Sequence, residues 1–156
     1  IRRQAEDIDG HLNDIFAAID YVKGLPIVDK NKIAMIGFSR GAALTLMAIA
    51  KRKEFKAAIV MAPAVGLLDR ALESVPRISA PVLVLVAAND RERRGGMVRN
   101  HVRGSRQIAA TLKKAGKEAE LIVYPPYRED GHRLFFEIGP YWKDVIKFFE
   151  TQNLTR

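Results

Sequence analysis

The sequence IAMIGFSRGAAL, residues 33–44, contains a short apolar run, a serine between two glycines and the start of a second apolar segment. The run that ends at Gly37 predicts a β-strand, and the apolar spacing from Ala43 onward predicts an α-helix. Ser39 then lies at the apex of a sharp turn, which we expect to leave no room for side chains at the two flanking glycine positions. A G-x-S-x-G turn presents the serine hydroxyl at the positive N-terminal end of a helix. The stretch therefore predicts a strand–turn–helix unit whose serine is available for chemistry.

Segments with strand-like and helix-like patterns alternate along the rest of the chain. Besides the strand at 32–37, the pattern predicts strands at residues 55–61, 81–86 and 119–124. Helices are predicted at residues 4–23, 40–51, near 67–74, 98–115 and 140–151. The run at 81–86 is apolar on both faces, which is typical of a buried parallel strand. The alternation predicts an α/β fold, a three-layer α/β/α sandwich with helices on both faces of a parallel sheet.

Composition places the chain among globular proteins. Its 156 residues fit a single domain, 1–156, and a hydrophobic content of 48% is enough to form a core. No apolar stretch approaches the roughly 18 residues that a membrane span needs, so we expect no membrane partner. The absence of cysteine excludes disulfides and thiolate metal sites and fits a reducing compartment. We therefore expect a cytoplasmic protein.

Positive charge is concentrated in one stretch. Lys and Arg outnumber Asp and Glu by 26 to 18, and residues 91–106 contain six arginines and one glutamate. The arginines are candidates for binding an anionic substrate, but we favour a solvated loop and helix start. Arg40, which directly follows Ser39, and Arg133, which directly follows His132, are better placed to contact a substrate. No nucleic-acid-binding motif accompanies the charge, so nucleic acid is not an expected partner.

A nucleophilic serine needs a base, and the base needs a carboxylate that orients it. In open parallel sheets such groups gather beyond the C-terminal ends of the strands. Asp90 follows the predicted strand at 81–86, and His132 follows the one at 119–124. The chain therefore predicts Ser39 as nucleophile, Asp90 as acid and His132 as base, in the order typical of α/β-hydrolases.

The other candidates for these roles are few. Of the three histidines, His11 lies within the first predicted helix and His101 lies in the arginine-rich stretch, where we expect a surface position. His132 follows a glycine and precedes an apolar segment that can anchor its loop. Glu92 remains an alternative to Asp90 as the acid.

On these residues the chain resembles the C-terminal part of an α/β-hydrolase, closest to the dienelactone hydrolase-like and prolyl-oligopeptidase-like serine esterases. The resemblance covers roughly residues 10–150 and rests on the turn at 37–41, the stretch at 80–90 and the pair 131–132. It implies that the backbone N–H of Arg40 supplies one donor of an oxyanion hole. Dienelactone hydrolases proper have a cysteine nucleophile, so Ser39 favours the esterases.

Part of the family's pattern is missing from the sequence. The resemblance implies several strands, and a loop with the second oxyanion donor, ahead of the helix at 4–23. Without them the strand at 32–37 has an unpaired apolar edge, which is an aggregation liability. We therefore expect the chain to be the C-terminal portion of a longer domain, with its second oxyanion donor outside the sequence.

Together these features predict a serine hydrolase that cleaves a carboxylic ester or lactone, in a small-molecule ester substrate, through an acyl-enzyme. A peptidase or an acyltransferase with the same three residues, and a non-catalytic binding module, remain alternatives. The sequence shows neither a cluster of metal ligands nor a G-x-G-x-x-G motif, so we expect no metal and no organic cofactor. The oligomeric state stays open, a homo-oligomer included.

Overall fold

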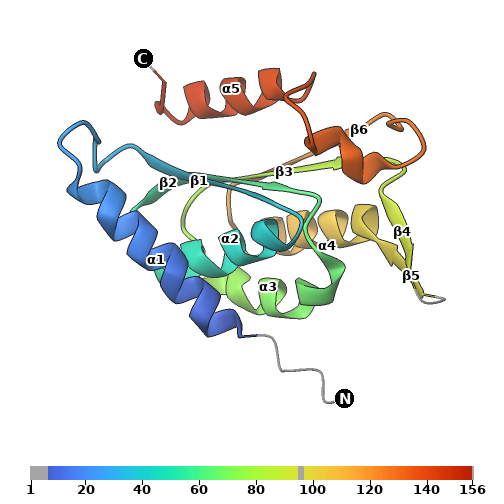
Figure 1. Cartoon of the computed structure of the whole chain (residues 1–156), viewed down its shortest axis with the longest axis horizontal. Helices are drawn as coiled ribbons and strands as arrows, with labels where there is room; N and C mark the ends of the chain where they lie inside the picture. The colour runs from blue at the N-terminus through green and yellow to red at the C-terminus, as the bar shows by residue number, and fades with distance from the viewer. Residues whose placement is uncertain (1–6, 95–96, 156) are drawn as a thin grey trace.

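The computed structural model describes residues 7–94 and 97–155. Of residues 92–94 and 97 only the backbone is described. Its centre is a sheet of four parallel strands in the order β1-β2-β3-β6 (Figure 1). The strands are β1 (Ile33–Phe38), β2 (Phe55–Met61), β3 (Val82–Ala87) and β6 (Ala119–Tyr124). All four lie where the sequence pattern predicts them, to within one residue at each end.

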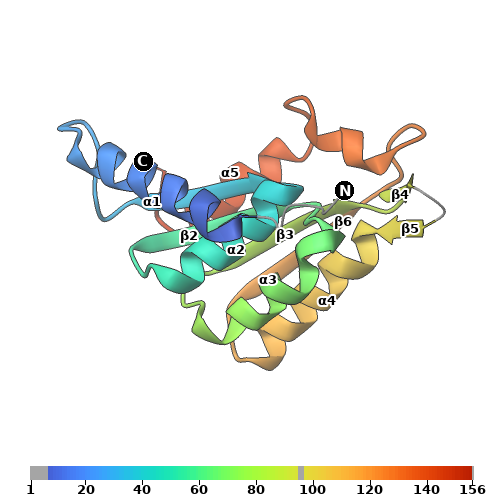
Figure 2. The same cartoon turned by 60° about the horizontal axis from the view of Figure 1, so that its bottom comes forward.

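Helices cover both faces of the sheet (Figures 1 and 2). Four α-helices and two short 3-10 turns lie on one face: α1 (Ile8–Gly24), α2 (Arg40–Lys51), α3 (Leu68–Ser74), α4 (His101–Lys114), η1 (Val65–Leu67) and η2 (Val75–Arg77). The opposite face carries α5 (Trp142–Thr151) and the 3-10 turn η3 (Gly131–Phe135). The α/β fold with a helix-flanked parallel sheet is therefore confirmed.

The strand pattern explains the two cores. Side chains alternate across a strand, so Val82 and Val84 of β3 pack against the four-helix face, whereas Leu83 and Leu85 pack beneath α5. Every residue of β3 is buried, as its continuous apolar run predicts. Burial of apolar surface contributes roughly 25 cal/mol per Å². Because β3 is buried on both faces, it contributes to both cores and stabilises the centre of the sheet.

The β1 side of the sheet is its open edge. Within the described residues β1 pairs only with β2, and Ile36 on its outward face is 39% exposed. An apolar groove of about 340 Å³ runs between α1 and β1. Its walls include Ile15, Ile19, Val22, Ile33, Met35 and Phe55. The edge thus matches the unpaired apolar strand expected from the sequence.

Three local features differ from the sequence predictions. Residues Arg91–Arg94 (β4) and Met97–Asn100 (β5) form an antiparallel hairpin where a loop and a helix start were expected. The helix α4 begins at His101 rather than at residue 98, because the Asn100 side chain accepts a hydrogen bond from the Arg103 N–H (2.9 Å) and caps it. On α5, Ile146 is 43% exposed, although the apolar pattern of residues 140–151 leads one to expect the apolar residues of this helix to be buried.

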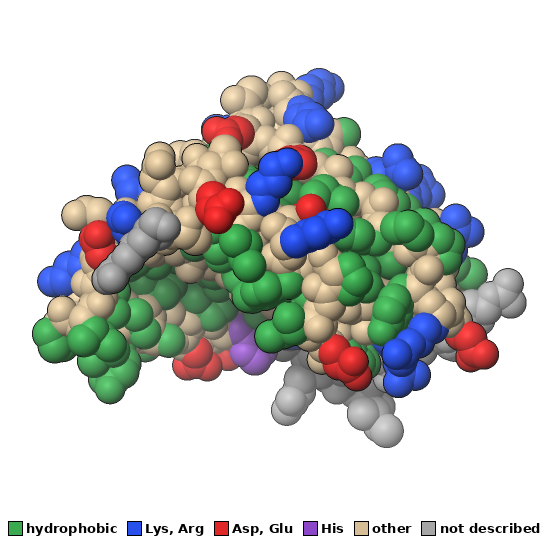
Figure 3. All heavy atoms as spheres, turned by 90° about the horizontal axis from the view of Figure 1, so that it is seen from above, with side chains coloured by type: hydrophobic (Ala, Val, Ile, Leu, Met, Phe, Trp, Pro, Cys, Tyr) green, Lys and Arg blue, Asp and Glu red, His purple; other side chains and the backbone are tan. Residues whose placement is uncertain are grey.

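The surface of the described residues carries no single basic face in the view from above. Figure 3 shows acidic and basic side chains interspersed among exposed hydrophobic ones on this side of the molecule. None of the helices that the structure describes is both long and apolar enough to cross a bilayer.

Candidate active site

Ser39 occupies a strained turn between β1 and α2. Its backbone has φ 52° and ψ −115°, a left-handed conformation that costs a residue with a side chain about 1–3 kcal/mol. Two hydrogen bonds tie the turn to the end of β2: the Ser39 N–H donates to the Met61 carbonyl (2.8 Å), and the Ser39 carbonyl accepts from the Ala64 N–H (3.0 Å). The hydroxyl does not cap α2. A strained serine held in this way, without a capping role, is typical of a serine that serves chemistry.

The two glycines around Ser39 differ in what they permit. A Cβ at Gly37 would lie 2.3 Å from the Gly41 carbonyl oxygen and 2.4 Å from Thr45 Oγ1, so only glycine fits there. A Cβ at Gly41 meets no described atom within 4 Å outside its own helix backbone. The expectation that both flanking positions exclude side chains is therefore wrong for Gly41. The strand packs against the helix at Gly37, whereas Gly41 faces away from it.

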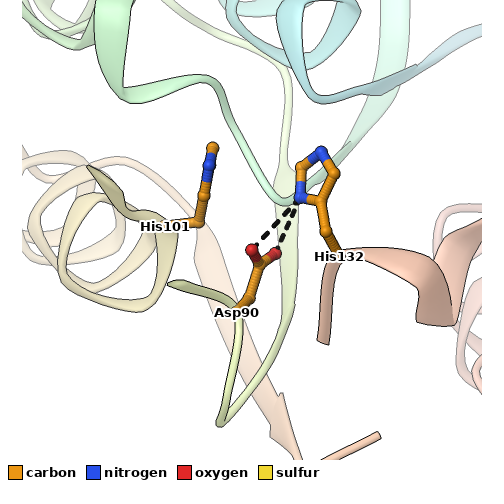
Figure 4. A group of neighbouring side chains, drawn as sticks. All are labelled: Asp90, His101 and His132. Carbon is orange, nitrogen blue, oxygen red and sulfur yellow. Dashed lines mark hydrogen bonds and ion pairs between the residues drawn. The ribbon is translucent and has the colours of Figure 1, made fainter. Parts of the chain in front are cut away.

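Asp90 and His132 form a hydrogen-bonded pair. Asp90 follows β3 and is 1% exposed, and His132 lies on η3 after β6. The His132 Nδ1 is 3.0 Å and 3.2 Å from the two carboxylate oxygens of Asp90. An ionised carboxylate only accepts, so Nδ1 carries the hydrogen of a neutral ring and Nε2 carries the lone pair. Figure 4 shows that Nε2 points away from Asp90.

Aromatic rings enclose the His132 imidazole. The Phe38 ring lies 4.6 Å from it and the His101 ring 4.7 Å, between centroids. Phe38 directly precedes Ser39, so this contact brings the β1–α2 turn next to the Asp90–His132 pair. Among the described residues no hydrogen bond joins Ser39 to His132. The structure therefore joins two of the three predicted residues directly and sets the third beside them.

Asn89 fastens the loop that leads to His132. Its side-chain oxygen accepts from the Tyr127 N–H (2.9 Å), and its amide nitrogen donates to the Arg128 carbonyl (3.0 Å). Asn89 adjoins Asp90, so one short segment after β3 both supplies the carboxylate and holds the loop of its partner. The sequence analysis gave Asn89 no role, because loop asparagines are common and the loop it contacts is distant in the sequence.

Gly131 allows the close approach of the two loops. A Cβ there would lie 2.6 Å from Asn89 Oδ1 and 2.7 Å from the Asp90 nitrogen. The Asp130 side chain accepts from the His132 N–H (2.9 Å) and caps η3. The position of His132 thus depends on the missing side chain of Gly131, on the Asp130 cap and on the two hydrogen bonds of the Asn89 side chain.

His101 is a site residue that the sequence analysis missed. It is 4% exposed, so the expected surface position is wrong. Its Nδ1 lies 3.1 Å from the Pro63 carbonyl oxygen, and its backbone N–H donates to the Asp90 carbonyl (3.2 Å). The β4–β5 hairpin pairs Arg91 with Asn100 and so returns the chain to Asp90. Only this long-range pairing brings His101 to the site, and no local pattern signals it.

Asp90, His101 and His132 form a cluster of metal-ligand type (Figure 4). Each offers one ligand atom, and these atoms all lie within 4.8 Å of one another. The expectation that the chain holds no cluster of metal ligands is therefore wrong, because His101 comes from a distant segment. The arrangement can act as a hydrogen-bonded carboxylate–imidazole pair or hold a cation.

A model of a known family covers most of the chain. The model described as the dienelactone hydrolase family matches residues 2–134. The chain belongs to the dienelactone hydrolase family. None of the curated proteins compared with it matches.

Solved structures share the fold of this dienelactone hydrolase family member at low identity. The acylaminoacyl peptidase of Pyrococcus horikoshii superposes with a TM-score of 0.69 at 19% identity, over 97% of this chain and 28% of that one. The dienelactone hydrolase of Anabaena variabilis gives 0.69 at 21%, over 96% and 61%. Acetyl xylan esterase 1 from Thermoanaerobacterium sp. gives 0.65 at 17%, over 97% and 56%. The chain thus spans less than two thirds of each of these structures.

The structure also places the other residues that the sequence analysis named. Arg40 is the first residue of α2, and N–H groups of a first helical turn point toward the N-terminal end of the helix. Arg133 is exposed on η3, and His11 is exposed on α1. The side chain of Glu92, the alternative acid, lies outside the described part of the chain. Arg91, Arg103 and Arg106 are exposed, as a solvated stretch predicts.

A tyrosine anchors α5 over the core beneath the site. The Tyr124 hydroxyl, at the end of β6, donates to Asp144 Oδ2 (2.6 Å). Burial, and then this hydrogen bond to a carboxylate, raise the pKa of Tyr124 well above its usual range. The phenol therefore stays protonated and the anchor is kept throughout the neutral and alkaline range in which imidazole chemistry operates.

Proposed function

We propose that this protein is a serine hydrolase that cleaves a carboxylic ester or lactone through an acyl-enzyme on Ser39. The observation that carries the proposal is the hydrogen-bonded pair of Asp90 and His132 beside the strained β1–α2 turn. Membership of the dienelactone hydrolase family supports it. The structural likeness to an acetyl xylan esterase is consistent with ester chemistry.

In the proposed reaction, His132 Nε2 takes the Ser39 hydroxyl proton as the oxygen attacks the ester carbonyl. Asp90 holds the imidazole through Nδ1 and stabilises its positive charge. The imidazolium then gives the proton to the leaving alkoxide, and the acyl group stays on Ser39. Water, deprotonated by the same nitrogen, attacks the acyl-enzyme, and the carboxylic acid leaves as Ser39 regains its proton.

The tetrahedral intermediate carries a negative oxygen that needs donors. The backbone N–H of Arg40 is the donor proposed here, because it belongs to the residue after the nucleophile and lies at a helix N-terminus. One such donor contributes about 10²–10³-fold to the rate. A second donor is not assigned among the described residues.

The surroundings of His132 favour an apolar group on the substrate. The Phe136 ring is 62% exposed and lies 5.8 Å from the Phe38 ring and 6.5 Å from His132, between centroids. These rings offer an apolar surface beside the nucleophile turn. We therefore expect medium-length or aromatic acyl esters to react faster than acetyl esters.

Two other functions are open to the same residues. A peptidase or acyltransferase would use the identical acyl-enzyme, and the likeness to an acylaminoacyl peptidase favours testing it. A non-catalytic binding module would keep the fold without an activated serine. Comparing p-nitrophenyl esters and a lactone with acyl-amino acid p-nitroanilides, with and without an alcohol acceptor, separates the enzymes. Absence of an activated serine identifies the binding module.

The experiment that tests the proposal compares hydrolysis of p-nitrophenyl butyrate by the native protein, Ser39→Ala, His132→Ala and His11→Ala. We expect the first two variants to lose at least 10³-fold in kcat/KM, and His11→Ala, an exposed change on α1, to keep native activity. Equal activity in the native protein and Ser39→Ala would reject Ser39 as the nucleophile.

A further inference from the structure

We propose that Asp90, His101 and His132 bind one divalent transition-metal ion, for which Zn²⁺ is the best match. The three side chains come from three separate segments: the end of β3, the start of α4 and the 3-10 turn η3. Imidazole nitrogen and carboxylate oxygen are ligands that zinc takes readily. Three protein ligands leave a fourth tetrahedral position for water.

The distances are close to those of a tetrahedral site. Ligand atoms bound to one zinc ion lie about 3.3 Å apart, given bonds of about 2.0–2.1 Å. The His132 Nδ1 and Asp90 Oδ2 are already 3.0 Å apart. All three ligand atoms lie within 4.8 Å of one another, so a tetrahedral site requires His101 to approach the pair by at most about 1.5 Å.

The hydrogen bonds of His101 prepare it as a ligand. The Pro63 carbonyl only accepts, so Nδ1 at 3.1 Å from it carries the hydrogen and Nε2 keeps its lone pair. A metal-binding histidine commonly donates its other ring hydrogen to a carbonyl in this way. The reaction proposed above assigns no chemical step to the His101 ring, whereas a metal site uses its free Nε2 lone pair.

Burial and access suit an ion of high affinity. Asp90 is 1% exposed and His101 4% exposed, so a cation there is shielded from competing water. The His132 side chain is 22% exposed, so the site is in contact with solvent. A divalent cation also compensates the buried charge of the Asp90 carboxylate.

Metal binding and ester hydrolysis exclude one another at this site, a consequence that rests on the proposed function. The ion takes the lone pair of His132 at Nδ1, so the neutral ring carries its hydrogen on Nε2. That nitrogen then cannot accept the Ser39 proton. The Asp90 carboxylate then binds the ion and no longer accepts the hydrogen bond from His132 Nδ1. Zn²⁺ is therefore expected to inhibit the enzyme reversibly.

The first arm of the test measures binding without any activity. Zn²⁺ is titrated into the protein in competition with a chromophoric chelator, for the native chain, His101→Gln and the matched control His11→Gln. The proposal predicts one ion per chain, at least tenfold weaker binding for His101→Gln, and native affinity for His11→Gln. Circular dichroism establishes that each variant is folded. No binding by the native chain, or equal binding by His101→Gln, would overturn the proposal.

The second arm distinguishes this inference from the proposed hydrolase. Each protein's p-nitrophenyl butyrate hydrolysis is measured with rising Zn²⁺ and compared with its own rate without metal. We expect native activity to fall to less than a tenth and to return with a chelator, at a concentration that rises at least tenfold for His101→Gln. Binding without any hydrolysis would reject the hydrolase and keep the metal site. Hydrolysis that Zn²⁺ leaves unchanged would reject the metal site alone.

Discussion

At the scale of single residues, the backbone conformation of Ser39 is the feature that bears most directly on function. A left-handed φ of 52° at a residue with a side chain persists only where the surroundings enforce it. Here the enforcing contacts are the hydrogen bonds to Met61 and Ala64 and the close packing at Gly37. The strained turn lowers the stability of the fold and holds this hydroxyl at the C-terminal end of β1.

The strained backbone at Ser39 predicts different stabilities for two inactive variants. Ser39→Gly relieves the left-handed conformation, whereas Ser39→Ala retains it, and both remove the hydroxyl. We expect Ser39→Gly to be more stable than Ser39→Ala by about 1 kcal/mol, with neither variant active. Urea unfolding followed by circular dichroism measures the difference. A Ser39→Ala variant that is the more stable of the two would show that the turn is unstrained.

Gly131 predicts a loss of activity without direct chemistry. In Gly131→Ala the new Cβ would lie 2.6 Å from Asn89 Oδ1, so the loop has to move and displace His132 from Asp90. A displacement of about 1 Å at a catalytic group costs up to about 10²-fold in rate. We therefore expect kcat for p-nitrophenyl butyrate to fall about 10–100-fold.

The control for this change is Gly24→Ala at the end of α1, where an added Cβ meets no described atom within 4 Å. This variant should keep the native kcat. A native kcat in Gly131→Ala would mean that the loop accommodates the methyl group and that its close packing does not position His132.

At the scale of elements, an ion-pair cluster ties α1 to the end of α2. The Arg52 Nη2 binds Asp20 Oδ1 (2.6 Å) and Glu54 Oε1, while its guanidinium lies 5.5 Å from the Phe16 ring centroid. The hydrogen bond from Arg52 lowers the pKa of Asp20. Burial acts to raise the pKa of Glu54, but hydrogen bonds from Arg52 and Lys23 outweigh it and lower that pKa.

These lowered pKa values predict how stability depends on pH. Carboxyls with folded pKa values below their ordinary 3.8 and 4.5 stabilise the fold above those values, and this contribution is lost as the pH falls through the folded values. We expect Arg52→Met to lower the Tm by about 2–4 °C at pH 7 and to lower it by less near pH 3. Thermal unfolding at both pH values tests this, with Arg106→Met, an exposed change on α4, as control. An equal Tm loss at both pH values would assign the effect to packing on Phe16.

Elements with strong apolar patterns were predictable from the sequence, and the β4–β5 hairpin was not. The run at 82–87 is β-branched and continuous, so local chemistry alone identifies β3. Arg91–Arg94 reads RERR and has no apolar alternation, so its strand conformation depends on pairing with Met97–Asn100. The burial of His101 follows from that pairing. Asp90 and His132 were predictable because strand ends in a parallel sheet meet at one edge.

At the scale of the whole molecule, the candidate site lies where the fold gathers its strand ends. The β1–α2 turn, the segment after β3 and the η3 turn after β6 all meet at the C-terminal edge of the sheet. One hydrophobic core on each face of the sheet holds the strands that lead into these three segments. Arg91, Arg103 and Arg106 of the arginine-rich stretch are exposed, and Figure 3 shows side chains of both charges mixed on one face of the molecule.

The most direct test of the account is covalent labelling of the protein with a fluorophosphonate, followed by peptide mass spectrometry. An activated serine reacts with this reagent, whereas an ordinary serine does not. The account predicts a single adduct on the peptide that contains Ser39, and its loss in Ser39→Ala and His132→Ala. Absence of any adduct in the folded native protein, or an adduct on a different residue, would contradict the assignment of Ser39 as the nucleophile.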